Sequence, residues 1–587
     1  MKQFFKFLFA SFIGSLISML IILFIVMGIV GAALSFKNKP VTTVQNQSVL
    51  QLKLNYPVGE RTLSNPLSGF NFNSVPNAGA GLDDIIKSIE KAKSDEKIQG
   101  ILISSGNVLA GVAATEAIRK ALIDFRESEK FVYAYADGYS QKAYYLASVC
   151  DKVFLHPMGS VDFKGLNAQM MFYKDLLDLV GVDVQVIRHG KFKSAVEPYL
   201  LDKMSEANRE QVTTYLGSLW SEITSQISES RGVEVARLNQ IADSLLGSNG
   251  KGAMASKLVD ELMYKDQFTS YLKEKTGLSD SQDLRLVSPK KYLTYARSVE
   301  KPKTEKERIA IVYAVGEIKQ GKGSDEIIGS DRISAAIREA RKDENVKAIV
   351  LRVNSPGGDA LASDIIGREI VLAKKEKPVI ISMGDVAASG GYWISAHGSY
   401  IFAEPTTITG SIGVFGMIPN FKGLVTDKLG VNVQDVSTNK NSDFISVFKP
   451  MPTYQRDVMQ GQIETIYDDF LTWVSEGRNM TKAQVDSIGQ GRVWSGINAK
   501  KIGLVDEFGG LNEAVAYAAK QAKIENYRRK ILPEPIDPFQ ELFNQYFGET
   551  KIVEKTLGKQ AKYYQYLKSV SEMEGVQARI PYVLEIN

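Results

Sequence analysis

The longest apolar run of the chain lies at its N-terminus. Residues 7–36 read FLFASFIGSLISMLIILFIVMGIVGAALSF and carry no charged side chain. About 20 such residues in a helix already cross the ~30 Å hydrocarbon core of a membrane. A cleaved signal peptide is the alternative, with the small residues at 31–33 as a cleavage site, but its apolar core is usually only about 7–15 residues long. The pattern favours a retained transmembrane signal-anchor within residues 1–40.

Lysines flank this run on both sides. Lys2 and Lys6 precede it, and Lys37 and Lys39 follow it. Positive residues favour the cytoplasmic side of a membrane, and here the two flanks nearly balance. We expect a single pass, with the short N-terminus in the cytoplasm and the large domain on the outer side.

The rest of the chain contains an internal repeat. LDDIIKSIEKAKSDEKIQGILIS at 82–104 and SDRISAAIREARKDENVKAIVLRV at 330–353 each join an amphipathic helical pattern to a buried strand pattern. A shift of 248 residues superposes the apolar positions of these segments, and it also places Asp137 on Asp385. Chance does not hold one register over so long a stretch, so two homologous domains are expected.

Each copy begins with a strand pattern and then alternates helical and strand patterns. This order is typical of a layered α/β domain in which helices cover the sheet. We assign residues 48–300 to the first domain and 309–525 to the second, joined by the charged, proline-containing linker 301–308. Residues 526–587 begin with a stretch that contains Pro533, Pro535 and Pro538 and continue in a polar, aromatic helical pattern, which predicts a helical tail.

Composition and charge exclude several classes of function. Lys and Arg number 71 against 67 Asp and Glu. The resulting net charge of +4 does not create a strong positive field that would attract nucleic acid. The single cysteine, Cys150, excludes an intrachain disulfide, and with only three histidines it makes a Cys/His zinc site unfavourable. No P-loop is present, and no GxGxxG follows a strand pattern. We expect no metal, organic cofactor or nucleic acid.

The second copy contains a serine with catalytic features. Ser389 lies in GDVAASGGYWI, directly before Gly390 and a helical pattern, and an upstream strand ends in NSPGGD with Gly357 and Gly358. Glycine pairs let a backbone turn and expose its N–H groups. A serine at the start of a helix lies where such groups stabilise developing negative charge. The alternative is a structural N-cap serine.

The first copy separates these two interpretations. Under the shift of 248, Gln141 takes the place of Ser389, and Leu109 and Ala110 take the places of the glycine pair. The fold therefore tolerates the loss of both features, which favours a chemical role for the serine. Downstream the asymmetry reverses, because Lys193 in GKFKSAVEP aligns with a serine of the second copy. One copy would then supply a base and the other a nucleophile.

A lysine base must be neutral, although the free side chain has a pKa of ~10.4. Burial disfavours the charged amine and lowers that pKa. We therefore expect Lys193 in an apolar crevice between the domains, out of contact with the carboxylate of Glu197. The alternative for Lys193 is an exposed lysine paired with Glu197. A histidine base is less favoured. His397 is about two helical turns beyond Ser389, and His156 lies in a strand-to-turn segment of the first copy. His189, four residues before Lys193, is expected at the surface or behind the residues of the site.

These motifs together resemble the signal peptide peptidase A (protease IV) family in its long, internally duplicated bacterial form. The resemblance also includes TGSIGVFG at 409–416 and GRVWSG at 491–496, and it covers nearly the whole chain. It implies two tandem crotonase/Clp-protease-like domains and a serine–lysine dyad. Ser389 would be the nucleophile, Lys193 the general base and then acid, and Ser411 the hydroxyl that orients the lysine. A turn residue is the alternative for Ser411.

The resemblance also implies where the protein works. It implies a membrane-tethered homotetramer in the bacterial inner membrane, with the catalytic domains on the periplasmic side, degrading signal peptide remnants. Gly357, Gly358 and Gly390 are candidates for the oxyanion hole. Two alternatives remain: a catalytically inactive binding scaffold, and a crotonase-type acyl-CoA enzyme, which would need neither Ser389 nor Lys193.

Overall fold

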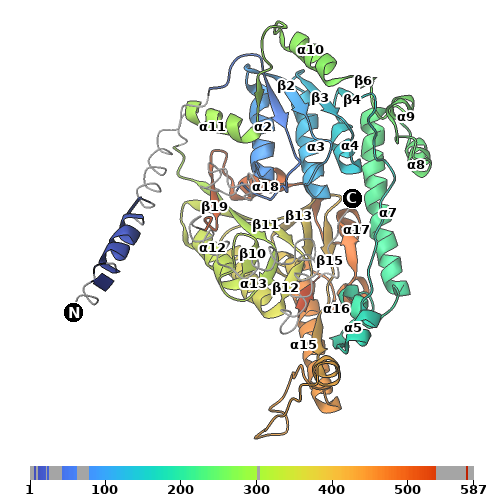
Figure 1. Cartoon of the computed structure of the whole chain (residues 1–587), viewed down its shortest axis with the longest axis vertical. Helices are drawn as coiled ribbons and strands as arrows, with labels where there is room; N and C mark the ends of the chain where they lie inside the picture. Colours follow the sequence, from blue (N-terminus) through green and yellow to red (C-terminus); the bar gives the residue numbers. More distant parts are fainter. Residues whose placement is uncertain are drawn as a thin grey trace.

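The described part of the chain forms two α/β units, one above the other in Figure 1. The computed structural model describes residues 6–7, 9, 11–21, 23–24, 43–62, 79–300, 304–536 and 577–579. The long helix α7 (Glu206–Arg231) begins beside the second unit and runs along the first. It therefore ties the two units together along one side.

The first unit is built on a parallel sheet of six strands. Leu50 and Leu52 belong to the apolar cluster beneath α2 (Leu82–Ser94) and α3 (Val112–Arg126), whereas Val49 packs on the opposite face, in the cluster of α10 (Lys265–Thr276). Alternate strand residues point to opposite faces, so helices bury both faces of this sheet. Its strands, in spatial order, are β6 (Glu261–Leu262), β4 (Lys152–Leu155), β3 (Phe131–Ala136), β2 (Ile98–Ile103), β1 (Ser48–Leu52) and β7 (Leu286–Val287).

The second unit has an eight-stranded sheet of the same plan. Helices α12 (Ser330–Lys342) and α13 (Ala360–Lys374) cover one face, and α18 (Leu511–Ala522) covers the other. The main path is β17 (Val493–Ser495), β15 (Ile408–Gly410), β13 (Val379–Ala388), β11 (Val346–Ser355), β8 (Arg308–Val315) and β19 (Arg528–Leu532), while β14 (Tyr400–Ala403) pairs with β13 and β18 (Glu507–Phe508) pairs with β14.

The predicted internal duplication is confirmed by the order of these elements. Helices α12 and α13 lie 248 positions after α2 and α3, with the same lengths. Helix α15 (Thr453–Arg478) has 26 residues, as α7 has. The other α-helices of the two units, among the described residues, are α4 (Gln141–Ala147), α5 (Lys174–Val180), α6 (Glu197–Leu200), α8 (Val235–Asp243), α9 (Gly250–Ala255), α11 (Pro289–Val299), α14 (Gly390–Ala396), α16 (Lys482–Ile488) and α17 (Gly496–Lys501).

The start of the predicted tail differs from expectation. Residues 528–532 were assigned to the tail, but they form β19 and pair in parallel with β8. The strand β7 occupies the equivalent place beside β1 in the first unit. The repeat therefore extends to Leu532 rather than ending at 525. The rest of the predicted helical tail, residues 537–576 and 580–587, lies outside the described residues.

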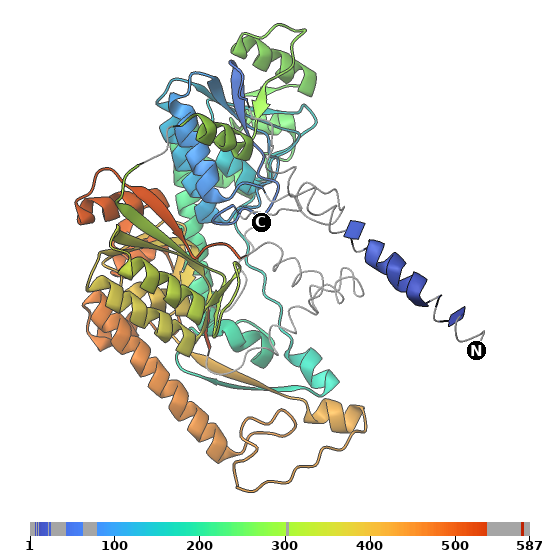
Figure 2. The ribbon, with the colours of Figure 1, turned by 90° about the vertical axis from the view of Figure 1, so that its left-hand side faces the viewer.

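A third sheet joins the two units. Its strands, in order, are β10 (Ile327–Gly329), β9 (Glu317–Lys319), β12 (Gly357–Asp359), β20 (Gln577–Arg579), β16 (Phe415–Asn420) and β5 (Asp183–Arg188). Strand β5 belongs to the first unit by sequence, yet it pairs antiparallel with β16 along all six residues. In Figure 2, α5 and β5, in teal, lie at the end of the second unit remote from the first. The chain that follows β5 thus reaches the second unit.

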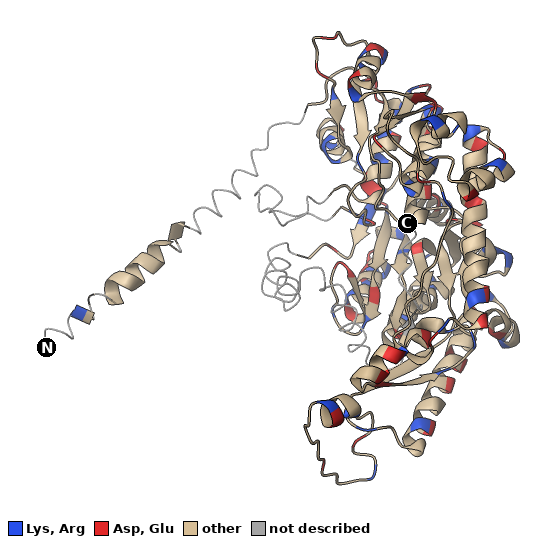
Figure 3. Ribbon diagram, turned by 45° about the vertical axis from the view of Figure 1, so that its right-hand side comes forward, with Lys and Arg blue, Asp and Glu red and all other residues tan. Residues whose placement is uncertain are grey.

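The predicted membrane anchor is described only in part. Residues 11–21 are helical with exposed side chains, and this helix projects away from both units. In Figure 3 the ribbon of both units is marked with charged residues in blue and red, whereas the helix of residues 11–21 is tan throughout. None of the helices that the structure describes is long and apolar enough to cross a membrane. Residues 25–42, which complete the predicted span, lie outside the described part.

Candidate active site

Ser389 occupies a sharp turn between β13 and α14. Its φ of 56° and ψ of −116° are uncommon for a residue with a side chain. The turn is held by its backbone, because the Ser389 N–H donates to the Gly410 carbonyl at 2.8 Å and the Trp393 N–H donates to the Ser389 carbonyl at 2.8 Å. The Ser389 side chain makes no capping hydrogen bond with α14. This finding contradicts the structural N-cap interpretation and leaves the hydroxyl available for chemistry.

Lys193 comes from the other unit and meets that hydroxyl. It lies five residues after β5, immediately before the 3₁₀ turn Ser194–Val196, and its side chain is fully buried. The Lys193 Nζ atom lies 2.9 Å from Ser389 Oγ, 3.1 Å from Ser411 Oγ and 3.2 Å from the Ser411 carbonyl oxygen. The structure thus brings together the three side chains that the sequence singled out.

Burial sets the electrostatics of this lysine. Desolvation lowers the pKa of Lys193 well below its usual range, and no described carboxylate counteracts it. The carboxylate of Glu197 instead accepts hydrogen bonds from Ser205 Oγ at 2.5 Å and from Asn208 Nδ2 at 2.9 Å. The exposed Lys193–Glu197 pair is therefore wrong, and the expected buried lysine is found.

The lowered pKa favours a neutral Lys193 amine, and the oxygen atoms around it can accommodate this form. A neutral amine has two N–H donors and one lone pair. Two acceptors are in place on Ser411, its carbonyl oxygen and its Oγ, which in turn donates to the Gly491 carbonyl at 3.3 Å. The lone pair is then left for the hydroxyl hydrogen of Ser389. Ser411 also has a positive φ, of 52°, so both serines beside the lysine are held in strained backbone.

Glycines leave room for this arrangement. A Cβ on Gly491 would lie 2.6 Å from Cβ of Lys193, so this first residue of the GRVWSG motif must lack a side chain. A Cβ on Gly358 would lie 2.0 Å from the Ile318 carbonyl oxygen.

The Gly357 N–H donates to Ser355 Oγ at 3.1 Å. Of the three predicted oxyanion donors, Gly357 is therefore engaged in another hydrogen bond.

Gln211 is a buried polar residue of the site that sequence reasoning missed. Its Nε2 donates to the Phe192 carbonyl at 3.0 Å and to Ser194 Oγ at 2.8 Å, on either side of Lys193. Its Oε1 accepts from the Val493 N–H of the second unit at 3.2 Å. A glutamine within a helix carries no motif, so only the position of α7 reveals this role.

The histidines take no part in the site. His189 Nδ1 lies 2.6 Å from Glu464 Oε2, and its ring stacks on Tyr467 at 3.9 Å between centroids. His397 packs against Trp473, and His156 packs edge-on against Tyr264. No hydrogen bond links a histidine to Ser389 in the described part of the chain.

The family of the chain follows from comparison with known proteins. Residues 124–279 and 372–525, one stretch in each unit, match the family model described as peptidase family S49. This chain belongs to peptidase family S49. The predicted resemblance is confirmed, and the protein is a serine protease. The alternatives of an inactive scaffold and of an acyl-CoA enzyme receive no support.

Relatives of this chain carry related names. It is 40% identical over 456 residues to protease 4 of Salmonella typhi, which covers 76% of this chain and 73% of that protein. It is 39% identical to protease 4 of Haemophilus influenzae, covering 76% and 74%. It is 30% identical over 546 residues to the chloroplastic serine protease SPPA of Arabidopsis thaliana, covering 92% and 78%. These named proteases thus match between 76% and 92% of this chain.

Among solved structures, a ClpP1 mutant from Listeria monocytogenes matches at 16% identity and a TM-score of 0.25, covering 35% of this chain and 94% of that one. A similarity this low does not test the predicted crotonase/Clp-protease-like fold. The duplicated α/β architecture rests on the strands and helices described above.

Proposed function

We propose that this chain is a membrane-anchored serine endopeptidase that uses a Ser389–Lys193 dyad. Its substrates would be cleaved signal peptides and similar apolar peptides in or near the membrane. The observation that carries the proposal is the 2.9 Å distance between Lys193 Nζ and Ser389 Oγ in a fully buried environment. A serine hydroxyl needs such a base because it is a weak nucleophile by itself.

The proposed reaction moves one proton through the lysine. The neutral amine takes the Ser389 proton while Oγ bonds to the carbonyl carbon of the scissile peptide bond. The ammonium then protonates the leaving amine, the C–N bond breaks, and an acyl-enzyme forms. Water hydrolyses this ester, with Lys193 again acting as base. Ser411 holds the amine in line through both of its oxygen atoms.

Developing negative charge on the carbonyl oxygen needs backbone donors nearby. Gly390 is the first residue of α14, a position whose N–H has no acceptor within the helix. Gly358 lies in β12, which contacts α14. These two N–H groups are the better oxyanion candidates, because that of Gly357 is already bonded to Ser355 Oγ. Loss of one such donor typically costs about 10²–10³ in rate.

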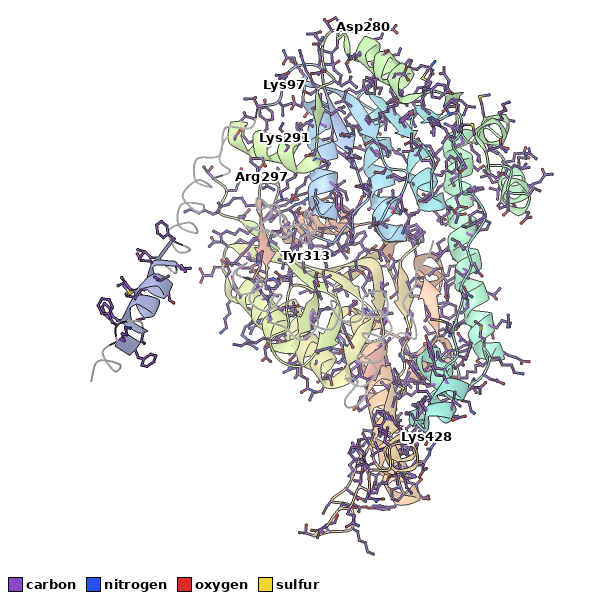
Figure 4. All side chains as sticks on the ribbon, in the orientation of Figure 1. Lys97, Asp280, Lys291, Arg297, Tyr313 and Lys428 are labelled. Carbon is purple, nitrogen blue, oxygen red and sulfur yellow. The ribbon has the colours of Figure 1, made fainter. Side chains whose placement is uncertain are left out.

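The membrane location and assembly are further parts of this proposal. We place the catalytic units on the periplasmic side of the bacterial inner membrane, anchored through the N-terminal apolar run. Exposed apolar side chains on α5 and after residue 428, near the label of Lys428 in Figure 4, support contacts with other copies in a homotetramer. They include Leu176, Leu179, Leu429, Val431 and Val436. Light scattering of the detergent-solubilised protein measures the assembly number.

Cleavage of an apolar peptide by purified variants tests the dyad. Ser389→Ala should lower kcat by about 10⁵–10⁶, and Lys193→Met by about 10²–10⁴, the usual contribution of a general base. Lys191→Ala is the matched control, since this exposed lysine lies two residues before Lys193 and should leave kcat unchanged. A folded Lys193→Met protein that cleaves as fast as the wild type would falsify the proposed base.

A further inference from the structure

The turn between α16 and β17 touches the proposed base on one side and its orienting serine on the other. The Gln490 carbonyl accepts from the Phe192 N–H at 3.0 Å. A Cβ on Gly491 would also lie 2.7 Å from Cα of Lys193, so these two backbones are in close contact. The Gly491 carbonyl accepts from Ser411 Oγ at 3.3 Å. The conformation of this turn therefore sets where Lys193 and Ser411 meet.

This turn has a strained backbone. Gln490 and Gly491 have φ values of 53° and 83°, and only the second is a glycine. A residue with a side chain keeps such a conformation only where its surroundings hold it. Here the Gln490 N–H donates to Tyr467 Oη at 3.0 Å, and Tyr467 Oη donates to Asp486 Oδ1 at 2.6 Å. One buried phenol thus accepts from the turn, while a carboxylate fixes the direction of its hydrogen.

The same tyrosine reaches the chain that carries the lysine. Its ring stacks on that of His189, with 3.9 Å between centroids, and His189 lies four residues before Lys193. Tyr467 is a residue of α15 in the second unit, whereas His189 and Lys193 belong to the first. The side chain therefore contacts both of the segments that pack against each other at the amine.

The first copy shows that packing between these helices does not need a tyrosine. Helices α7 and α8 begin 247 positions before α15 and α16, and the same shift places Trp220 on Tyr467 and Asn239 on Asp486. Trp220 Nε1 donates to Asn239 Oδ1 at 2.7 Å, so the link between the two helices is kept. An indole offers no acceptor to a backbone N–H, whereas a phenol both donates and accepts. The accepting hydroxyl is therefore found in the copy whose turn borders the dyad.

We propose that Tyr467 is a positioning residue of the dyad, because its hydroxyl holds the strained turn that places Gly491 against Lys193. This inference rests on the proposed Lys193 base. Removal of the hydroxyl leaves the Gln490 N–H without its acceptor, and the turn relaxes. A shift of the amine by about 1 Å is enough to lower kcat by about 10²-fold, and water admitted beside the amine favours the ammonium form.

Tyr467→Phe tests this role, since it removes the hydroxyl and keeps the ring. We expect it to lower kcat by about 10–100-fold, to leave KM within about twofold, and to move the rising limb of the kcat/KM pH profile to higher pH. Tyr292→Phe is the matched control, because this buried phenol of the first unit also donates to a carboxylate, Asp95 Oδ2 at 2.9 Å. The control should match the wild type in kcat and in the pH profile. A purely structural role would lower the stability of both variants, measured by denaturant unfolding, and leave both pH profiles in place.

Substitutions of Asp486 give a second test, which decides the question if Tyr467→Phe does not fold. Asp486→Asn keeps an oxygen acceptor for the phenol and should stay close to the wild-type kcat, whereas Asp486→Ala should lower kcat as Tyr467→Phe does. The pH profile of Tyr467→Phe is also measured together with His189→Gln. This background removes titration of the stacked imidazole as a source of the shift.

Lys193→Met is measured alongside these variants. A Lys193→Met protein that cleaves like the wild type would overturn the dyad and this inference with it. If Lys193→Met is impaired while Tyr467→Phe keeps the kcat and the pH profile of the wild type, the dyad stands and the positioning role of Tyr467 is wrong.

Discussion

Gln211 accepts a hydrogen bond from the backbone N–H of Val493 at 3.2 Å, and this contact joins the two units beside the proposed base Lys193. The other end of the same amide donates to the Phe192 carbonyl and to Ser194 Oγ. The side chain is fully buried, so each of these bonds is made without competition from water. Gln211 thus fixes the chain on both sides of Lys193 relative to the second unit.

We predict that Gln211→Leu lowers kcat by about 10–100-fold with little change in KM. A displacement of the base by about 1 Å is enough for a loss of this size. Gln211→Glu should also move the rising limb of the kcat/KM pH profile to higher pH, because a carboxylate near the amine favours the ammonium form. Steady-state kinetics across pH measures both effects.

Thr213→Leu is the control for these variants, since Thr213 is exposed on the same helix. It should leave kcat and the pH profile unchanged. A purely structural role for Gln211 would lower stability but leave the pH profile of Gln211→Glu in place, and that outcome would contradict the positioning role.

The duplication explains why Ser389 and Lys193 could be singled out from the sequence as candidates for catalysis. Each copy serves as a control for the other, so Ser389 and Lys193 stand out as departures from a shared pattern. The local helical and strand patterns were equally informative, because α2 and α12 are amphipathic and bury equivalent faces. Ser411 could be assigned only from the family resemblance, since a serine between glycines is also common in turns.

Relationships between distant segments could not be predicted in the same way. The role of Gln211 depends on α7 crossing to the second unit, and no local pattern encodes that crossing. The pairing of β5 with β16 has the same origin, because strand partners are chosen by tertiary packing. For β19, the strand follows a helix and precedes prolines, and its partner β8 lies about 220 residues earlier in the chain.

Lys193 should make the protein less stable at neutral pH than a variant with an apolar side chain there. Burial lowers the pKa of Lys193 in the folded state, so the unfolded chain binds more protons between that pKa and the ordinary one near ~10.4. The stability of the wild type therefore rises with pH across this window. Lys193→Met should raise the free energy of unfolding at pH 7, and this gain should shrink as the pH approaches 10.

Denaturant unfolding at several pH values, in the Ser389→Ala background to prevent autolysis, measures this difference. Lys191→Met is the control, because an exposed lysine has no comparable penalty. If Lys193→Met raised the free energy of unfolding by the same amount at pH 7 and at pH 10, Lys193 would be charged in the folded protein.

A buried ion pair also joins the two units. Arg352 Nε of the second unit donates to Glu60 Oε2 of the first at 2.8 Å, and Asn354 Nδ2 donates to Glu60 Oε1 at 2.7 Å. Both charged side chains are almost wholly buried, near Tyr313, which Figure 4 labels at the junction of the units. Removal of one partner leaves the other charge buried without compensation.

We therefore predict that Glu60→Ala lowers the free energy of unfolding by about 3–5 kcal/mol. Lys174→Ala, which removes an exposed ion pair with Asp178, should change it by less than about 1 kcal/mol. Denaturant unfolding of both variants provides the comparison. Equal effects of the two substitutions would mean that water reaches the Glu60–Arg352 pair.

Two buried glutamates, one from each unit, influence each other electrostatically. Glu116 of the first unit accepts hydrogen bonds from Thr406 Oγ1 at 2.6 Å and from Gln226 Nε2 at 2.6 Å. Glu404 of the second unit is 4% exposed, and in the described part of the chain its Oε1 has no hydrogen-bond partner. Burial, and then the charge of Glu116, raise the pKa of Glu404 to about 8, despite the opposing effect of Lys120.

A carboxyl group with a raised pKa favours the folded state only while it is protonated. The folded protein binds more protons than the unfolded chain between about pH 4.3, the ordinary value for glutamate, and pH 8, so Glu404 makes stability fall as the pH rises through this window. Glu404→Gln should remove this loss, because an amide keeps the shape of the protonated acid. The variant should match the wild type near pH 4 and exceed its free energy of unfolding by at least about 1 kcal/mol at pH 8. Glu116→Gln should reduce the same pH dependence, because it removes the neighbouring charge. If the free energy of unfolding of the wild type did not fall between pH 5 and pH 8 relative to that of Glu404→Gln, Glu404 would be ionised throughout this range.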